Sequence, residues 1–130
     1  MTVGLSAANL ANKWLDMLAG TAFTAPAAFW VKLHTADPGS AGATAAAVGD
    51  ANRKQVTWAA ASAGSKSMSS MSGGWTNGGT SETLTHLSFW DASTVGNFLG
   101  SCALTASQAW ASTNTFSLTS LSISFTPIAA

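Results

Sequence analysis

Short runs in which apolar and polar residues alternate constrain this chain more than any other feature of its sequence. Such alternation is typical of strands with one buried and one exposed face, and turn signals at regular spacing separate the runs. It fits antiparallel pairing better than a buried parallel sheet. Strands are predicted over residues 28–34, 55–60, 84–91, 97–104 and 115–126, with a weaker strand at 66–71.

Two of these runs are irregular. In the weak run, Met68 and Met71 do not share a face of a regular strand. In the last run the apolar phase flips between Leu118 and Leu121. A shift of one residue sends side chains to the opposite face, so a bulge or corner is expected near residues 119–120.

One short helix precedes the strands. Ser6 is a good N-cap and Gly20 a plausible stop signal. Between them an apolar face at helical spacing is formed by Leu10, Trp14, Met17 and Leu18. The pattern predicts a mainly β protein, an antiparallel β-sandwich or jelly-roll-like domain with one N-terminal helix. We expect a single domain over residues 1–130, with an arm and helix at 1–20 and the β-domain at 28–126.

The chain has very little charge. Asp, Glu, Lys and Arg make up 8% of its 130 residues and the net charge is zero, whereas charged residues are about 25% of an average domain. Near-zero net charge promotes association, so the surface suits packing against other chains. The sequence has no basic patch, so nucleic-acid binding is not predicted. No apolar run predicts a membrane span or a secretion signal, so we expect assembly in a cytoplasm.

The few ionisable residues form no recognisable catalytic or metal-binding pattern. His34 and Asp37 flank one turn, His86 and Asp91 share a later strand, and no G-x-S-x-G sequence is present. The histidines, cysteine and carboxylates lack metal-ligand spacing, and no cofactor motif occurs. We expect His34 and His86 to bond to backbone or hydroxyl groups, Cys102 to be a small buried hydrophobe, and the protein not to be an enzyme.

Tryptophan is abundant, with six copies. Trp58 is expected in the core together with Phe89. Trp30 and Trp90 lie opposite the main apolar faces of their strands, which fits either a second buried face or an exposed aromatic patch for subunit packing or sugar stacking. The candidate interface residues are Leu5, Leu10, Trp14, Trp30, Arg53, Trp75, Trp90, Trp110 and Ile128.

One stretch resembles a known family. Residues 30–43 read W-V-K-L-H-T-A-D-P-G-S-A-G-A, which is similar to the L-H-T-A-D-P-G signature of small proteins from tailed phages of actinobacteria and their prophages. Residues 85–92, T-H-L-S-F-W-D-A, resemble a later strand and turn of that family. The resemblance extends over residues 5–125 and departs from the pattern at 52–55. Members are commonly labelled phage tail fibre, minor tail or virion structural proteins.

The resemblance implies a non-enzymatic virion protein assembled in the host cytoplasm. Our first hypothesis is a capsid decoration protein, a minor capsid or cement protein bound to the major capsid lattice as a trimer or other symmetric oligomer. The alternative is a tail-fibre, tail-tip or receptor-binding module. In that case host cell-wall glycan would stack on Trp30, Trp75, Trp90 and Trp110. A long fibre shaft is not indicated, because no coiled coil or shaft repeat is present.

Overall fold

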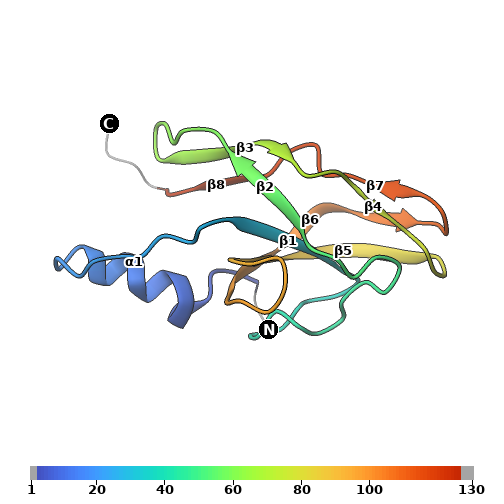
Figure 1. Ribbon diagram of the computed structural model, residues 1–130, viewed down its shortest axis with the longest axis horizontal. Coiled ribbons are helices and arrows are strands. Elements are labelled where there is room, and N and C mark those ends of the chain that lie inside the picture. The colour runs from blue at the N-terminus through green and yellow to red at the C-terminus, as the bar shows by residue number, and fades with distance from the viewer. Residues whose placement is uncertain (1–2, 127–130) are drawn as a thin grey trace.

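The computed structural model describes residues 3–126 of the chain. Antiparallel strands dominate it, and the longer ones form a six-stranded sheet in the order β6-β5-β1-β2-β3-β8, while β4 and β7 pair separately. The strands are β1 Phe29–His34, β2 Lys54–Trp58, β3 Ser65–Met71, β4 Trp75–Thr76, β5 Glu82–Trp90, β6 Phe98–Trp110, β7 Thr115–Phe116 and β8 Ser122–Ser124. The sheet curls, so that β3 and β8 lie above β1 and β5 in Figure 1. The predicted mainly β, sandwich-like fold class is confirmed.

The apolar positions of the alternating strands form the core. Val31 pairs with Phe89 and Leu33 with Leu87 across β1 and β5, and all four side chains are buried. Val56 of β2 continues the same buried face. The apolar faces predicted for these strands therefore meet inside the curl of the sheet.

A bulge explains the two methionines that a regular strand could not place together. Trp58 pairs with Met68, but Thr57 pairs with Ser70, so Ser69 is an extra residue in β3. The extra residue restores the phase, and both Met68 and Met71 pack against the core. The weakly predicted strand is confirmed, and the irregularity that weakened it is the bulge.

The last predicted strand is not continuous. The chain leaves β7 at Phe116 and enters β8 at Ser122, with a bend at Thr119. The two short strands pair with different partners, β7 with β4 and β8 with β3. The expected corner near residues 119–120 is thus confirmed, whereas one strand over 115–126 is wrong.

The N-terminal helix begins and ends where predicted. It starts as a π-helical turn, η1 Ala7–Ala11, and continues as α1 Asn12–Met17. The Ser6 hydroxyl accepts a hydrogen bond from the Asn9 N–H. Gly20 has φ +85°, and the next N–H, of Thr21, bonds to the carbonyl of Asp16, which is the pattern of a Schellman stop.

The helix lies beside the sheet and does not cover it (Figure 1). Of its predicted apolar face only Leu10 is buried, Trp14 is half-buried, and Met17 and Leu18 are exposed. The helix packs on the core of the sheet through Leu10 and Trp14, and the Asn9 side chain donates to the Phe98 carbonyl. Within the described residues we find no helix with the length and apolarity of a membrane span.

Candidate interaction site

Four of the five carboxylate side chains bond to the backbone of loops. Asp37 accepts the N–H of Gly39 in the predicted Asp-Pro-Gly turn. Glu82 accepts the N–H groups of Val48 and Gly49, and Asp91 accepts the backbone and side-chain N–H groups of Asn97. Within residues 3–126 no three His, Cys, Asp or Glu side chains gather where they could hold a metal ion.

His34 is buried in a hydrogen-bonded chain. Its Nδ1 lies 2.8 Å from the Thr44 carbonyl and its Nε2 lies 2.7 Å from the Ser88 hydroxyl. Trp90 Nε1 donates to the same hydroxyl. These contacts fit a neutral ring that donates from Nδ1 and accepts at Nε2. Burial lowers the pKa of His34, and the nearby Lys32 adds to this effect, while the bond to Thr44 opposes it.

His86 and Cys102 also have the structural roles that we expected from the sequence. His86 Nδ1 lies 2.7 Å from the Thr85 hydroxyl, so the expected bonding of both histidines to backbone or hydroxyl groups is confirmed. Cys102 is half-buried, and burial raises the pKa of its thiol. A protonated thiol is a poor nucleophile, so this cysteine has the character of a small hydrophobe.

The tryptophans divide between core and surface. Trp75 and Trp110, which we considered as stacking or interface residues, are 0% and 2% exposed. Their indole N–H groups donate to the carbonyls of Asn52 and Asn114, respectively. Both rings are therefore enclosed by their own chain, and the prediction that they face a partner or sugar is wrong. Trp58, expected in the core, is only half-buried.

Trp30 and Trp90 sit opposite each other on β1 and β5, on the face away from the core. The guanidinium of Arg53 lies 3.7 Å from the centroid of the Trp90 ring, and it donates to the carbonyls of Ala92 and Val95. Arg53 thereby covers Trp90 and holds the loop after β5. Burial and then the charge of Arg53 lower the pKa of the neighbouring Lys32. Arg53 and Trp90 therefore contact other parts of the same chain, whereas no such contact is shown for the Trp30 side chain among the described residues.

A groove on the helix is the most exposed apolar feature. It has a volume of about 560 Å³, and every residue that lines it is apolar: Leu5, Ala11, Trp14, Leu15, Met17, Leu18 and Phe125. Seven large apolar side chains are exposed among the described residues, and five of them lie here. Leu18 is 83% exposed and Leu15 is 64% exposed. We call these seven lining residues the α1 groove.

A second apolar pocket adjoins the α1 groove. It has a volume of about 310 Å³ and lies between the helix and the curled sheet, beside Phe29 and Trp58. Trp14 and Phe125 line both hollows, and their rings pack edge to face with centroids 5.3 Å apart. This aromatic pair lies between the two apolar hollows and lines both of them.

The structure separates the candidate interface residues into groups. Leu5 and Trp14 line the α1 groove. Leu10 is 5% exposed and lines the adjoining pocket, not the α1 groove. Trp30, Arg53 and Trp90 belong to the cluster on β1 and β5, and Ile128 lies outside the described residues.

Five groove residues were missed as candidates: Ala11, Leu15, Met17, Leu18 and Phe125. A signal for them existed in the sequence. With Leu15 added to the predicted apolar face, the helix has more apolar side chains than one face can bury.

The comparison with protein families gives one match. The model of a family described as Podophage GP4 fiber I protein gp80 matches residues 5–126. The match spans the N-terminal helix, the whole curled sheet and the residues of the α1 groove. No curated protein matches the chain.

Proposed function

The chain belongs to the podophage GP4 fiber I protein gp80 family, and from that premise we propose that it is a fibre subunit fixed to a neighbouring virion chain through the α1 groove. A phage virion structural protein of the tail-fibre type is what the family match supports. The match favours our alternative hypothesis, a tail-fibre module, over our first hypothesis, a capsid decoration protein. Capsid decoration gains no support.

The single observation that supports attachment through this surface is the exposed α1 groove. A helix normally buries its apolar stripe, and a contiguous exposed apolar surface marks an interaction site. Burying a leucine fully contributes about 1.5–3 kcal/mol, so Leu15 and Leu18 together could supply a useful part of an attachment energy. We propose that the occupant is an apolar segment of another virion protein.

Binding of host glycan has less geometric support than attachment. Of the four tryptophans proposed to stack on sugar, Trp75 and Trp110 are buried and Trp90 is covered by Arg53. Trp30 alone is half-buried and free of such a contact. A sugar site normally combines an aromatic face with several polar groups in a hollow, and none of the pockets described above includes Trp30.

The experiment compares two exposed apolar sites in a phage that encodes this chain. The double variant L15S/L18S makes the α1 groove polar, and V95S makes a similar change at a residue that is 87% exposed but lies outside the groove. We expect L15S/L18S to reduce the amount of the protein in purified virions by about tenfold or more, since about 1.4 kcal/mol corresponds to tenfold in affinity.

The control V95S should enter virions at the wild-type level. Both variants should keep the wild-type melting temperature, because the changed side chains lie at the surface. Wild-type incorporation of a folded L15S/L18S protein would contradict the proposal.

A further inference from the structure

The pocket between the helix and the curled sheet has walls of aromatic rings. Its volume is about 310 Å³, and two of its lining residues, Leu10 and Leu99, belong to the buried core. Five further lining residues are aromatic and come from segments far apart in the sequence: Trp14, Phe23, Phe29, Trp58 and Phe125. We call this hollow the aromatic pocket. None of its five rings is fully buried, so its lining extends from the core to the solvent.

Four of these rings already pack in pairs. Trp14 and Phe125 meet edge to face with centroids 5.3 Å apart, and Phe29 and Trp58 do the same at 5.0 Å. Aromatic rings favour this arrangement because the positive edge of one ring then faces the negative face of the other. A further ring in the pocket gains contacts of the same kind, which a saturated group does not make.

The lining has almost no polar group that a ligand can bond. Ser65 and Lys66 are the two lining residues with polar side chains, and the Lys66 ammonium already donates to the Ala59 carbonyl at 2.8 Å. A sugar or a charged ligand would lose its hydrogen bonds to water here and regain few of them, which costs free energy. The pocket therefore selects an uncharged ligand that consists mainly of carbon.

The size of the aromatic pocket fits one ring system. An apolar cavity of about 150 Å³ is enough to bind benzene, and the aromatic pocket, at about 310 Å³, has room for a single ring or two fused rings. This volume favours one side chain or one small molecule over a longer segment of chain.

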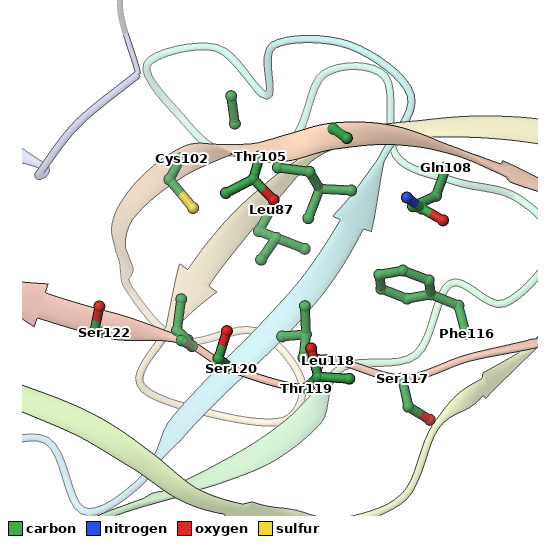
Figure 2. Close-up of a pocket in the computed structure, with 14 residues that line it drawn as sticks. Leu87, Cys102, Thr105, Gln108, Phe116, Ser117, Leu118, Thr119, Ser120 and Ser122 are labelled. Atoms are coloured by element: carbon green, nitrogen blue, oxygen red, sulfur yellow. The ribbon is translucent and has the colours of Figure 1, made fainter.

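The groove in Figure 2 is larger and has a different chemistry. It has a volume of about 450 Å³ and is lined by β6 and by the segment that connects β7 to β8. Figure 2 shows the Gln108 amide and the hydroxyl groups of Thr105 and Ser120 around it. Groups of this kind bind water, and an apolar ring that displaces the water does not replace those hydrogen bonds. We therefore expect the aromatic pocket, and not this groove, to take an apolar ring.

We propose that the aromatic pocket binds one uncharged aromatic ring, a side chain of the virion segment that occupies the α1 groove. The source of the ring rests on the proposed function, whereas the affinity of the pocket for a ring does not. Trp14 and Phe125 line both hollows, so a segment in the groove passes directly beside the pocket. Aromatic side chains held in pockets are frequent hot spots of interfaces.

The test uses phenol as a free ring. Phenol is titrated into the purified full chain, and the indole N–H resonances are followed by NMR. We expect saturable shifts at Trp14 and Trp58, which line the aromatic pocket, and no shifts at the buried Trp75 and Trp110. Cyclohexanol is the matched saturated ring. It should bind about fivefold more weakly, because it cannot make edge-to-face contacts.

Variants check where the ring binds. Phe23 lines the aromatic pocket but not the α1 groove, so F23S should lower the affinity for phenol by about fivefold or more. The control V48S changes an apolar residue that is 74% exposed and lies outside both hollows, and it should bind phenol like wild type. L15S/L18S should also bind phenol like wild type, because Leu15 and Leu18 line only the groove. Near-ultraviolet circular dichroism verifies that each variant is folded.

Incorporation into virions identifies the source of the ring. We expect F23S to reduce the amount of the protein in purified virions, as L15S/L18S does, and V48S to leave it unchanged. If L15S/L18S is lost from virions but wild type does not bind phenol, attachment through the α1 groove stands and the ring site is overturned. If phenol binds but L15S/L18S enters virions normally, the proposed function fails, and with it the assignment of the ring to a virion segment.

Three results would overturn the ring site itself. They are the absence of saturable shifts with phenol, an affinity for cyclohexanol equal to that for phenol, and phenol binding that a folded F23S protein leaves unchanged. The first two are measured on wild type, so they do not depend on the folding of any variant.

Discussion

At the scale of single residues, polar side chains in this protein mostly hold the backbone in place. His34 connects the loop at Thr44 to Ser88 on β5, and Arg53 connects β2 to the loop after β5 while it stacks on Trp90. Both side chains therefore make structural contacts with backbone or neighbouring side chains of their own chain.

The first prediction concerns the pH dependence of stability. The pKa of His34 is lower in the folded protein than its ordinary value, mainly because of burial. The unfolded chain therefore binds the proton more readily, and the stabilisation is complete above the unfolded pKa of about 6.5. It is lost as the pH falls through the folded pKa. We expect the melting temperature to fall between about pH 7 and pH 5.

An NMR titration measures the responsible group directly. The His34 ring should titrate below the ordinary histidine value. A His34 resonance that titrates at or above about 6.5 would contradict the assignment. The H34Q variant, if folded, should show a weaker dependence of melting temperature on pH over the same range.

At the scale of elements, β6 connects the N-terminal arm to the sheet. Gly100 pairs with Leu5 in an isolated bridge, and the arm passes so close that a side chain at Gly100 would meet it. A Cβ atom built there lies 2.7 Å from the Gly4 carbonyl oxygen. The glycine therefore allows a close backbone approach and not an unusual φ angle. The docking of the arm, and with it the position of Leu5 in the α1 groove, depends on this contact.

The second prediction tests that contact. G100A should force the arm to move and destabilise the protein by about 1–3 kcal/mol, as overpacking does. Hydrogen exchange should accelerate at the N–H groups of Ser6 and Ser101, which bond across this bridge.

The control for G100A is G78A. A Cβ atom built at Gly78 lies 3.6 Å from its nearest neighbour, an ordinary contact. This variant should have nearly wild-type stability and unchanged exchange in the arm. Unchanged exchange in G100A would show that the arm does not depend on the close approach.

At the scale of the whole molecule, the core lies inside the curl of the sheet, and the exposed α1 groove lies on the N-terminal helix. The sheet buries its central strands well, while the helix and the edge strand β6 keep apolar or unpaired groups exposed. The lack of charge acts at the same scale, because it removes repulsion between chains that come together.

The third prediction concerns the core. Phe89 is 6% exposed, so F89A should cost about 3–5 kcal/mol. Trp58 packs edge to face against Phe29 but borders the apolar pocket and is half-buried. W58A should cost less, about 1–2 kcal/mol, because part of its ring is already in contact with water. Urea denaturation measures both. A larger loss for W58A would place Trp58 in the core and contradict the structure.

The sequence by itself determined what depends on neighbours along the chain. Alternation predicted the strands β1, β2 and β5, the first half of β6, and the composition of the core face. Ser6 and Gly20 marked the ends of the helix, and Asp37 marked the turn that it stabilises. The sequence also predicted that His34 and His86 bond to backbone or hydroxyl groups, because strand residues have such groups close by. These features arise within a few residues, so local propensity and periodicity decide them.

Only the tertiary structure decided which apolar residues stay exposed. Trp75 is buried because its indole reaches Asn52, 23 residues away, and no local pattern distinguishes it from Trp30. The helix face of Leu15 and Leu18 is open because the helix packs on the core through Leu10 and Trp14 instead. The edge of β6 is open because the arm ends its pairing at Ser101. Burial at each of these places depends on where distant segments pass, and sequence periodicity does not contain that information.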